Sequence, residues 1–225
     1  MKIYPTITTL VDYKEKIEEI NALKLEKVCV FLTGLNFEER KELFKELEKT
    51  TIKEIPFVHI RNDVKTEELD FLINRYKTKV FNLHSKEEHP SLYDYSKYKD
   101  SIYIENVYNV FSAEDLLNWA GICLDFSHLE NDRLMCKERY KKNLKIIKNS
   151  RIGCCHISAI KDTYYIDRSG EKRYDNHSSS ELSEFDYLKK YDKKFFSEFC
   201  AIELNNSISY QLEVIDYIKK LFNEK

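Results

Sequence analysis

Glycine and proline are scarce in this sequence, with four glycines and three prolines among 225 residues. So few glycines leave no Gly-rich phosphate-binding loop, and three prolines leave no Pro-rich linker. A large excess of one charge is also missing, since 37 Lys and Arg face 39 Asp and Glu for a net charge of −2. This balance excludes a basic nucleic-acid-coating protein and an acidic disordered tail. The composition is that of an ordinary globular protein.

Long apolar runs are missing as well. No stretch approaches the ~18 residues of a membrane span, and the start MKIYPTITTL has no apolar signal-peptide core. Five of the six cysteines lie inside apolar runs such as VCVFL and GCCHI, where cysteine acts as a small buried hydrophobe. We therefore expect a cytoplasmic protein with reduced thiols and no membrane partner.

Short apolar runs alternate with longer amphipathic stretches along the whole chain. The runs predict strands at Lys2–Thr8, Lys27–Thr33, Ile55–Ile60, Lys79–His84, Ser101–Asn106, Gly121–Phe126, Arg151–Ile157 and Phe199–Leu204. The stretches between them predict helices at Val11–Leu23, Phe37–Lys49, Thr66–Tyr76, Ala113–Trp119, Arg133–Lys148 and Ser209–Phe222. Asn36 with Glu39, and Ser112 with Asp115, have the spacing of capped helix starts.

Strands that are apolar on both faces and alternate with helices predict a parallel sheet covered by helices. Eight such strands without a break in composition favour a single (β/α)8 TIM barrel domain over residues 1–225, with short loops. The alternative is an open doubly wound sheet, which usually carries a glycine fingerprint that is missing here. Two connections depart from the pattern, Ser85–Asp100 and the polar, aromatic Ser158–Tyr174.

Metal-ligating side chains recur at the predicted strand ends. Six successive strands end at or near His59, His84, Glu105, Asp125, His156 and Glu203. Three more candidates follow closely in Asp-x-x-His and Asp-x-His patterns: His128, Asp175 and His177. The carboxyl ends of all barrel strands meet at one mouth, so these side chains become neighbours there. Bound divalent cations would balance so many carboxylates and imidazoles.

Other interpretations hold for each residue alone. A buried histidine is often a hydrogen-bonded core residue, and a strand-end carboxylate can cap the next helix. As a set, however, five of the six histidines fall on this one predicted rim, and only His89 lies off it. That concentration predicts a metal site.

The motifs IEN at Glu105, LDFSH from Leu124 to His128, HIS at His156, DNH ending at His177 and IEL at Glu203 resemble the xylose isomerase-like barrels. This group includes sugar isomerases and epimerases and the endonuclease IV family, and the resemblance covers nearly the whole chain. In the isomerase branch it implies one metal, with two glutamates that exchange a proton with the sugar. The four ligands would be Glu105, Asp125, His156 and Glu203, with Glu105 and Glu203 as the catalytic pair.

The endonuclease IV branch implies three metals instead. The first metal would bind His59, His84 and Glu105. The second would bind the four residues of the isomerase site, with Glu105 bridging the first and second metals. The third would bind His128, Asp175 and His177. Imidazole and carboxylate ligands suit Zn²⁺, with Mn²⁺ as the alternative, so we expect two or three ions.

The additional histidines favour phosphoester hydrolysis, in which several metals generate a hydroxide and neutralise the attacked phosphate. The main prediction is therefore an endonuclease IV-like hydrolase acting on abasic DNA or a smaller phosphorylated compound. The alternative is a sugar or sugar-phosphate isomerase or epimerase with one metal. A third possibility is a barrel that binds a ligand without catalysis.

Basic residues near the predicted mouth are candidates for binding a phosphate, namely Arg61, Lys161, Arg168 and Arg173. The alternative is that the loop carrying the last three is only a solvated lid. Two features depart from the family pattern: Ser178–Ser180 replace a glycine turn after His177, and Asp162 is displaced, with Ala159 where an acid is common. A net charge of −2 gives no global attraction to DNA, so a small phosphorylated partner is as consistent as DNA.

Overall fold

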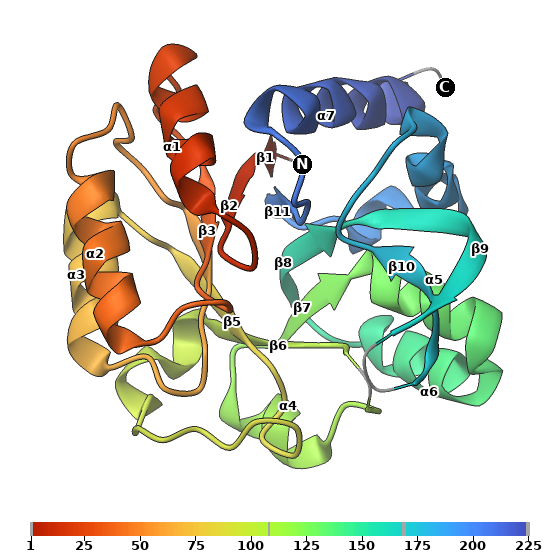
Figure 1. The fold of residues 1–225 in the computed structure, drawn as a ribbon. Helices are drawn as coiled ribbons and strands as arrows, with labels where there is room; N and C mark the ends of the chain where they lie inside the picture. Colours follow the sequence, from red (N-terminus) through yellow and green to blue (C-terminus); the bar gives the residue numbers. More distant parts are fainter. Residues whose placement is uncertain (1, 108, 168–169, 224–225) are drawn as a thin grey trace.

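A parallel β-sheet forms the centre of the molecule, in a computed structural model that describes residues 2–107, 109–167 and 170–223. Its strand order is β1-β11-β8-β7-β6-β5-β4-β3-β2, with helices on the outside (Figure 1). The strands are β1 (Lys2–Tyr4), β2 (Thr6–Thr8), β3 (Cys29–Phe31), β4 (Phe57–His59), β5 (Val80–Leu83), β6 (Ile102–Glu105), β7 (Ile122–Asp125), β8 (Ile152–Ile157) and β11 (Phe199–Ile202). Most are buried on both faces, which explains their unbroken apolar character.

The sheet closes on itself through its first strand. β1 pairs in parallel with β11, with Lys2 opposite Phe199, and β2 pairs in parallel with β3, with Thr6 opposite Cys29. Pro5 separates β1 from β2, because proline has no N–H to donate to a strand ladder. The two pieces therefore act as one interrupted strand with a neighbour on each side. This gives eight strand positions around a closed ring and confirms the predicted (β/α)8 barrel.

Helices follow most of the strands and cover the outside of the barrel (Figure 1). They are α1 (Tyr13–Ala22), α2 (Phe37–Leu47), α3 (Thr66–Tyr76), α4 (Ala113–Asn118), α5 (Phe126–Met135), α6 (Lys137–Ile147) and α7 (Ile208–Asn223). Both predicted caps are confirmed: Asn36 and Glu39 form a capping box at α2, and Ser112 Oγ accepts a hydrogen bond from Asp115 N at 3.0 Å at α4. Within the described residues, every helix is too short or too polar to cross a bilayer.

The prediction of one helix at Arg133–Lys148 is wrong, because two helices, α5 and α6, cover this region and the first begins seven residues earlier, at Phe126. α5 begins at Phe126, directly after β7, because the Asp125 side chain accepts a hydrogen bond from His128 N at 2.8 Å and caps the helix. Cys136, with φ −136° and ψ 70°, then separates α5 from α6. The short turn brings residues of α5 to the barrel mouth.

The connection between β8 and β11 also differs from the β/α pattern. The Ser158–Tyr174 region contains an antiparallel hairpin of β9 (Ala159–Ile166) and β10 (Lys172–Asn176), visible at the side of the barrel in Figure 1. The 3-10 helices η2 (Leu182–Lys190) and η3 (Lys193–Phe195) follow it; a third, η1 (Ser96–Ser101), precedes β6. A strand pattern was not evident from the sequence because most of β9 is exposed, without apolar alternation.

Two apolar layers hold the fold together. The larger lies between strands and helices, and the smaller fills the barrel with Phe31, Phe57, Tyr103 and small residues, three of them cysteines. All six cysteines are free and five are buried, which confirms their predicted role as small hydrophobes. Phe31 and Phe57 pack against His156, with ring centroids 4.6 and 5.4 Å away. The polar barrel mouth therefore rests on an apolar floor.

Candidate metal centre

All nine predicted ligand residues lie together at the mouth of the barrel. Each has a side-chain nitrogen or oxygen within 4 Å of a counterpart in another member. Barrel strands or the residues directly after them supply His59, His84, Glu105, Asp125, His156 and Glu203. α5 supplies His128, and β10 with its following residue supplies Asp175 and His177. Residues up to 144 positions apart in the sequence, His59 and Glu203, thus share one site.

Four of these side chains, Glu105, Asp125, His156 and Glu203, form what we call the central cluster. His156 Nδ1 lies 3.4 Å from Glu105 Oε2, 3.6 Å from Asp125 Oδ2 and 3.3 Å from Glu203 Oε2. His156 Nδ1, Asp125 Oδ2 and Glu203 Oε2 are buried without a hydrogen-bond partner. Unpartnered buried polar atoms are costly, and here they converge on one point.

The spacing in the central cluster is that of ligands around a cation. Ligand atoms 2.0–2.2 Å from a tetrahedral ion lie about 3.3–3.6 Å from one another. Three groups of ligand-type residues in the described chain have atoms close enough to hold an ion: His59, Glu105 and His156; Glu105, Asp125 and His128; and Asp125, His156 and Glu203. The donor set therefore fits a divalent metal.

Asp125 presents only one of its two carboxylate oxygens to the cluster. Oδ1 accepts hydrogen bonds from Ser127 Oγ at 2.6 Å and from His128 N at 2.8 Å. The Asn106 side chain fixes the backbone of Asp125: its Oδ1 accepts a hydrogen bond from Asp125 N at 2.8 Å, and its Nδ2 donates to Asp125 O at 2.9 Å. Oδ2 is left facing His156, so the capping turn of α5 also orients a ligand.

Asn82, on β5, is a buried member of the site that the sequence analysis missed. Its Nδ2 donates to Glu105 Oε2 at 2.6 Å, and its Oδ1 lies 3.3 Å from His156 Nε2. An amide oxygen in that place accepts a hydrogen bond from the Nε2–H group of His156, and in the neutral imidazole this leaves the Nδ1 lone pair for the cluster. The signal was present in the sequence, because Asn82 lies two residues before His84 and so faces the same side of the strand.

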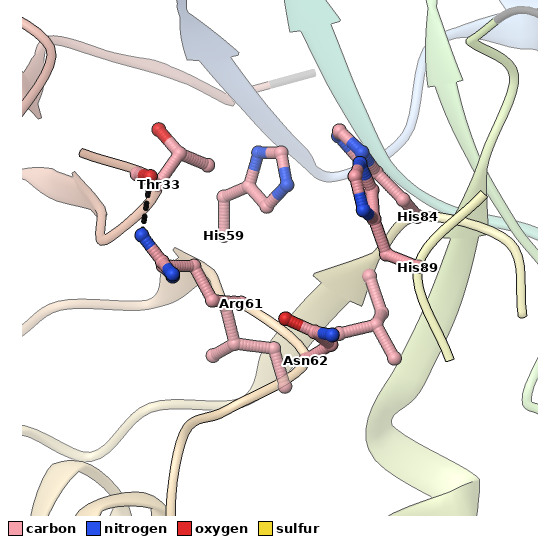
Figure 2. A pocket seen from close by; sticks show the side chains of 8 residues that line it. Thr33, His59, Arg61, Asn62, His84 and His89 are labelled. Carbon is pink, nitrogen blue, oxygen red and sulfur yellow. Dashed lines mark hydrogen bonds between the residues drawn. The ribbon is translucent and has the colours of Figure 1, made fainter. Parts of the chain in front are cut away.

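His59 and His84 approach one carboxylate oxygen of Glu105, and His128 of α5 approaches the other. His59 Nδ1 is 3.8 Å and His84 Nε2 is 3.9 Å from Glu105 Oε2, and the two rings are 5.0 Å apart. His89, expected away from the rim, lies beside His84 with ring centroids 5.2 Å apart (Figure 2). The expectation for His89 was wrong because a turn after β5 folds it back, with His89 N donating to Ser85 O at 2.9 Å.

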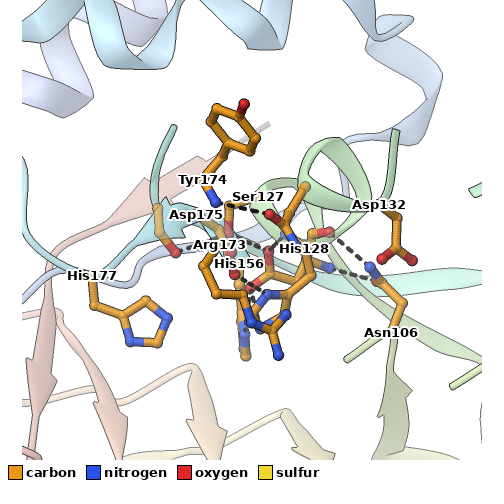
Figure 3. Close-up of polar contacts among 12 residues, drawn as sticks. Asn106, Ser127, His128, Asp132, His156, Arg173, Tyr174, Asp175 and His177 are labelled. Atoms are coloured by element: carbon orange, nitrogen blue, oxygen red, sulfur yellow. Dashed lines mark hydrogen bonds and ion pairs between the residues drawn. The ribbon is translucent and has the colours of Figure 1, made fainter. Parts of the chain in front are cut away.

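His128, Asp175 and His177 do not form a three-ligand group among the described residues. His128 Nδ1 and Asp175 Oδ2 are 2.6 Å apart, a hydrogen-bonding distance, and His128 Nε2 faces Glu105 and Asp125 at 3.8 Å. The rings of His128 and His177 are 6.4 Å apart, and His177 Nε2 lies 3.8 Å from Glu203 Oε1 (Figure 3). Asp175 therefore holds a histidine that faces the cluster, as carboxylates behind metal-bound histidines do.

Charge at the site favours a cation. Burial would raise the pKa of Glu105, but the nearby His156 and His59 outweigh it and keep the pKa of this carboxyl low. Burial would likewise lower the pKa of His128, but Asp125 and Asp175 hold that pKa well above its usual range. His59 has its pKa lowered well below the usual range, mainly by burial. Burial would also lower the pKa of His156, but Cys123, Glu105 and Glu203 hold that pKa well above its usual range. Without a metal, protonated His128 and His156 balance the carboxylates, and a bound ion would displace protons.

The predicted substrate-binding residues lie in three different settings. Lys161 Nζ pairs with Glu184 Oε1 at 2.7 Å, and buried Arg173 Nε pairs with Asp167 Oδ2 at 3.0 Å. Arg61 lies beside His59 and His84, lining the same pocket (Figure 2). Arg168 lies outside the described residues. All three described residues are thus paired with a carboxylate, since Arg61 Nε lies 3.0 Å from Asp63 Oδ1, but Asp63 does not line the pocket that Arg61 shares with His59 and His84.

No protein-family model and no curated protein matches the chain. Solved structures that match include the probable 3-DHS dehydratase AsbF involved in petrobactin synthesis from Bacillus anthracis, at 13% identity and a TM-score of 0.46, covering 96% of this chain and 98% of that one. A D-tagatose 3-epimerase-like protein matches at 15% identity and a TM-score of 0.44, with 97% of each chain covered. The structure AsfvAP:AG matches at 12% identity and a TM-score of 0.41, covering 98% and 99%. Likenesses this distant assign no activity.

Proposed function

We propose that this protein is a divalent-metal-dependent isomerase or epimerase of a small sugar or sugar phosphate. The observation that carries the proposal is the convergence of Glu105, Asp125 and Glu203 on His156 Nδ1, within 3.3–3.6 Å. This one-ion site was the alternative drawn from the sequence, and it is supported better than hydrolysis because His128 and Asp175 are engaged with each other.

The residues of the central cluster would hold Zn²⁺ or Mn²⁺, since three carboxylates and one imidazole suit either ion. When bound, the ion would supply Lewis-acid polarisation of neighbouring oxygens of the substrate. The apolar floor of Phe31 and Phe57 would exclude water from beneath it. Asn82 would keep His156 in the tautomer that offers Nδ1.

Glu105 and Glu203 are the two residues that can also move a proton. Each has one oxygen turned to His156 and a second turned to another histidine: Glu105 Oε1 lies 3.8 Å from His128 Nε2, and Glu203 Oε1 lies 3.8 Å from His177 Nε2. Asp125 lacks this freedom, because Ser127 and His128 N occupy its other oxygen. One glutamate would remove a proton beside the substrate carbonyl and the other would return one.

Phosphoester hydrolysis is the second candidate, and His59 and His84 are the observation that favours it. Both face Glu105, which belongs to two of the three ligand groups and so could bridge two ions. Hydrolysis with several metals would use this extra pair. Two of the basic residues expected to bind phosphate, Lys161 and Arg173, are instead ion-paired, which makes this candidate the weaker one.

The test combines metal content with proton exchange. We expect one tightly bound ion per chain by elemental analysis, and deuterium incorporation from D₂O at the carbon beside the carbonyl in a panel of aldoses, ketoses and their phosphates. Glu105→Gln and Glu203→Gln should abolish the exchange, whereas Glu181→Gln, at an exposed position, should leave it unchanged. His156→Ala should lose the ion itself.

Three results would contradict the proposal. Two or three tight ions together with cleavage of abasic-site DNA or of a small phosphodiester, lost in His156→Ala, would establish the hydrolase instead. Stoichiometric metal without exchange or cleavage on any of these compounds would reject both activities. A protein that binds no divalent ion after loading would be a non-catalytic barrel.

A further inference from the structure

A cavity of about 240 Å³ opens beside the central cluster, and we call it the Arg61 pocket. Its polar lining is given by Thr33, His59, Arg61, Asn62, His84 and His89, with two aliphatic side chains completing it. Figure 2 shows the Arg61 side chain and the three imidazoles around one opening. Two of them, His59 and His84, also lie within 4 Å of Glu105 Oε2, so the pocket adjoins the metal centre.

The lining of the Arg61 pocket has an unusual charge pattern. It contains one guanidinium and three imidazoles, and none of the described residues that line it is acidic. The central cluster next to it has three carboxylates around one imidazole. The mouth is thus divided into a side rich in carboxylates, which suits a cation, and a side rich in N–H donors, which suits an anion.

Arg61 is held in place from behind. Its Nε donates to Asp63 Oδ1 at 3.0 Å, and buried Arg40 donates to the same oxygen through Nη1 at 3.1 Å. Arg40 is in turn fixed by Glu68, at 2.7 Å from Nε to Oε1. Arg61 Nη1 also donates to Thr33 O at 3.3 Å, while Nη2 has no acceptor among the described residues. The guanidinium is therefore preorganised with a donor left over.

The loop that brings His89 to the pocket is tied to the same strand end. Asn62 Nδ2 donates to Pro90 O at 2.9 Å, and Leu92 N donates to Asn62 O at 2.9 Å. Tyr95 Oη, further along the loop, donates to Val64 O at 2.5 Å. These hydrogen bonds fix the loop that carries His89 to the segment that carries Arg61, on one side of the pocket.

The opposite edge of the mouth lacks these properties. The hollow beside the hairpin is lined by Lys161 together with Asp162, Glu181 and Glu184, and Lys161 is paired with Glu184 at 2.7 Å. A negatively charged group placed there would meet three carboxylates and one neutralised lysine. An anion is therefore better accommodated on the Arg61 side.

We infer that the Arg61 pocket is an anion subsite, and that the substrate is a small hydroxy-carbonyl compound with a terminal oxyanion. Arg61 Nη2 and the imidazole of His89 would donate to that oxyanion. We take the reacting carbons to lie at the central cluster, so this assignment rests on the proposed function. Phosphate and carboxylate share the required chemistry, and a cavity of about 240 Å³ has room for either group.

The experiment titrates the metal-loaded protein separately with inorganic phosphate and with acetate, by calorimetry. We expect one of the two to bind, which also identifies the oxyanion. Arg61→Gln should weaken that binding about 10- to 100-fold, because a hydrogen-bonded charged partner is lost. Lys172→Gln, at an exposed position of β10, is the matched control and should bind as the unsubstituted protein does. If Arg61→Gln fails to fold, His89→Asn, in an exposed loop, replaces it as the test and should also weaken anion binding.

The experiments distinguish failure of the anion subsite from failure of the proposed isomerase or epimerase activity. If neither anion binds, or if Arg61→Gln and His89→Asn bind as tightly as the unsubstituted protein, the anion subsite is wrong while the metal stoichiometry and deuterium exchange still stand. If metal binding or exchange fails but the anion still depends on Arg61, the subsite holds and the proposed reaction is wrong. Equal loss of binding in Lys172→Gln would also overturn the assignment.

Discussion

His128 Nδ1 and Asp175 Oδ2 lie 2.6 Å apart, joining the first turn of α5 to the inner strand of the β9–β10 hairpin. This contact directs His128 Nε2 towards Glu105 and Asp125 at 3.8 Å from each. It gives the hairpin, which replaces a helix of the barrel pattern, a defined part in building the metal centre. Asp175 acts on the centre through another residue.

Asp175→Asn therefore tests how the hairpin contributes. We expect the affinity for the divalent ion to fall about 10- to 100-fold, because the orienting carboxylate is lost, while the number of ions at saturation stays the same. Competition with a chelating dye measures the affinity and elemental analysis the number. Asp162→Asn, at an exposed position of the same hairpin, is the control. Loss of one ion per chain at saturation would instead make Asp175 a direct ligand.

Asn82→Leu tests the amide that joins two members of the central cluster. It removes the hydrogen bond to Glu105 Oε2 and the partner of His156 Nε2. We expect metal affinity to fall by a similar factor of about 10–100, and the free energy of unfolding to fall by about 1–3 kcal/mol from unpaired buried groups. Asn149→Ala, which removes an exposed amide, should change neither. A loss of stability with unchanged metal affinity would limit Asn82 to a structural role.

Metal removal should destabilise the protein. Buried atoms of His156, Asp125 and Glu203 that have no hydrogen-bond partner among the described residues would become ligands of a bound ion. An ion at a thousand times its dissociation constant stabilises the folded state by about 4 kcal/mol, or roughly 10 °C in the unfolding midpoint of a chain this size. Thermal unfolding with EDTA and with added Mn²⁺ or Zn²⁺ measures the shift. Glu203→Gln should shrink it, and an unchanged midpoint in the unsubstituted protein would argue against a metal centre.

Lys16 predicts a pH dependence of stability away from the metal. Burial lowers its pKa to about 8 from 10.5, and its Nζ donates to Thr8 Oγ1 at 2.5 Å and Leu204 O at 2.7 Å. Between these pH values the unfolded chain holds more protons than the folded one, so stability from this group rises with pH. Relative to Lys16→Met, the unsubstituted protein should gain about 2–3 kcal/mol from pH 8 to 10.5. Urea denaturation across this window measures the difference, and a constant difference would refute the prediction.

The barrel and its mouth were predictable because burial on both faces leaves a continuous apolar run at each parallel strand. Each predicted strand is present, and the carboxyl-end residues converge as the barrel geometry requires. The start of α5 was missed because Asp125 is both the last residue of β7 and the N-cap of α5. The sequence pattern around Asp125 indicated the strand end but not that a helix begins at the next residue. The hairpin and His89 depend on contacts with distant segments, which local periodicity does not record.

The interrupted first strand has a consequence for how the site comes into being. The ring closes only when β1 meets β11, across about 200 residues of chain, and Glu203 follows directly on β11. Contacts between such distant segments form late, because their loop-closure entropy is compensated only by the last pairings. We therefore expect the carboxylate of Glu203 to take its place at the metal centre when β1 and β11 pair. Metal uptake during refolding would then report the moment at which the barrel closes.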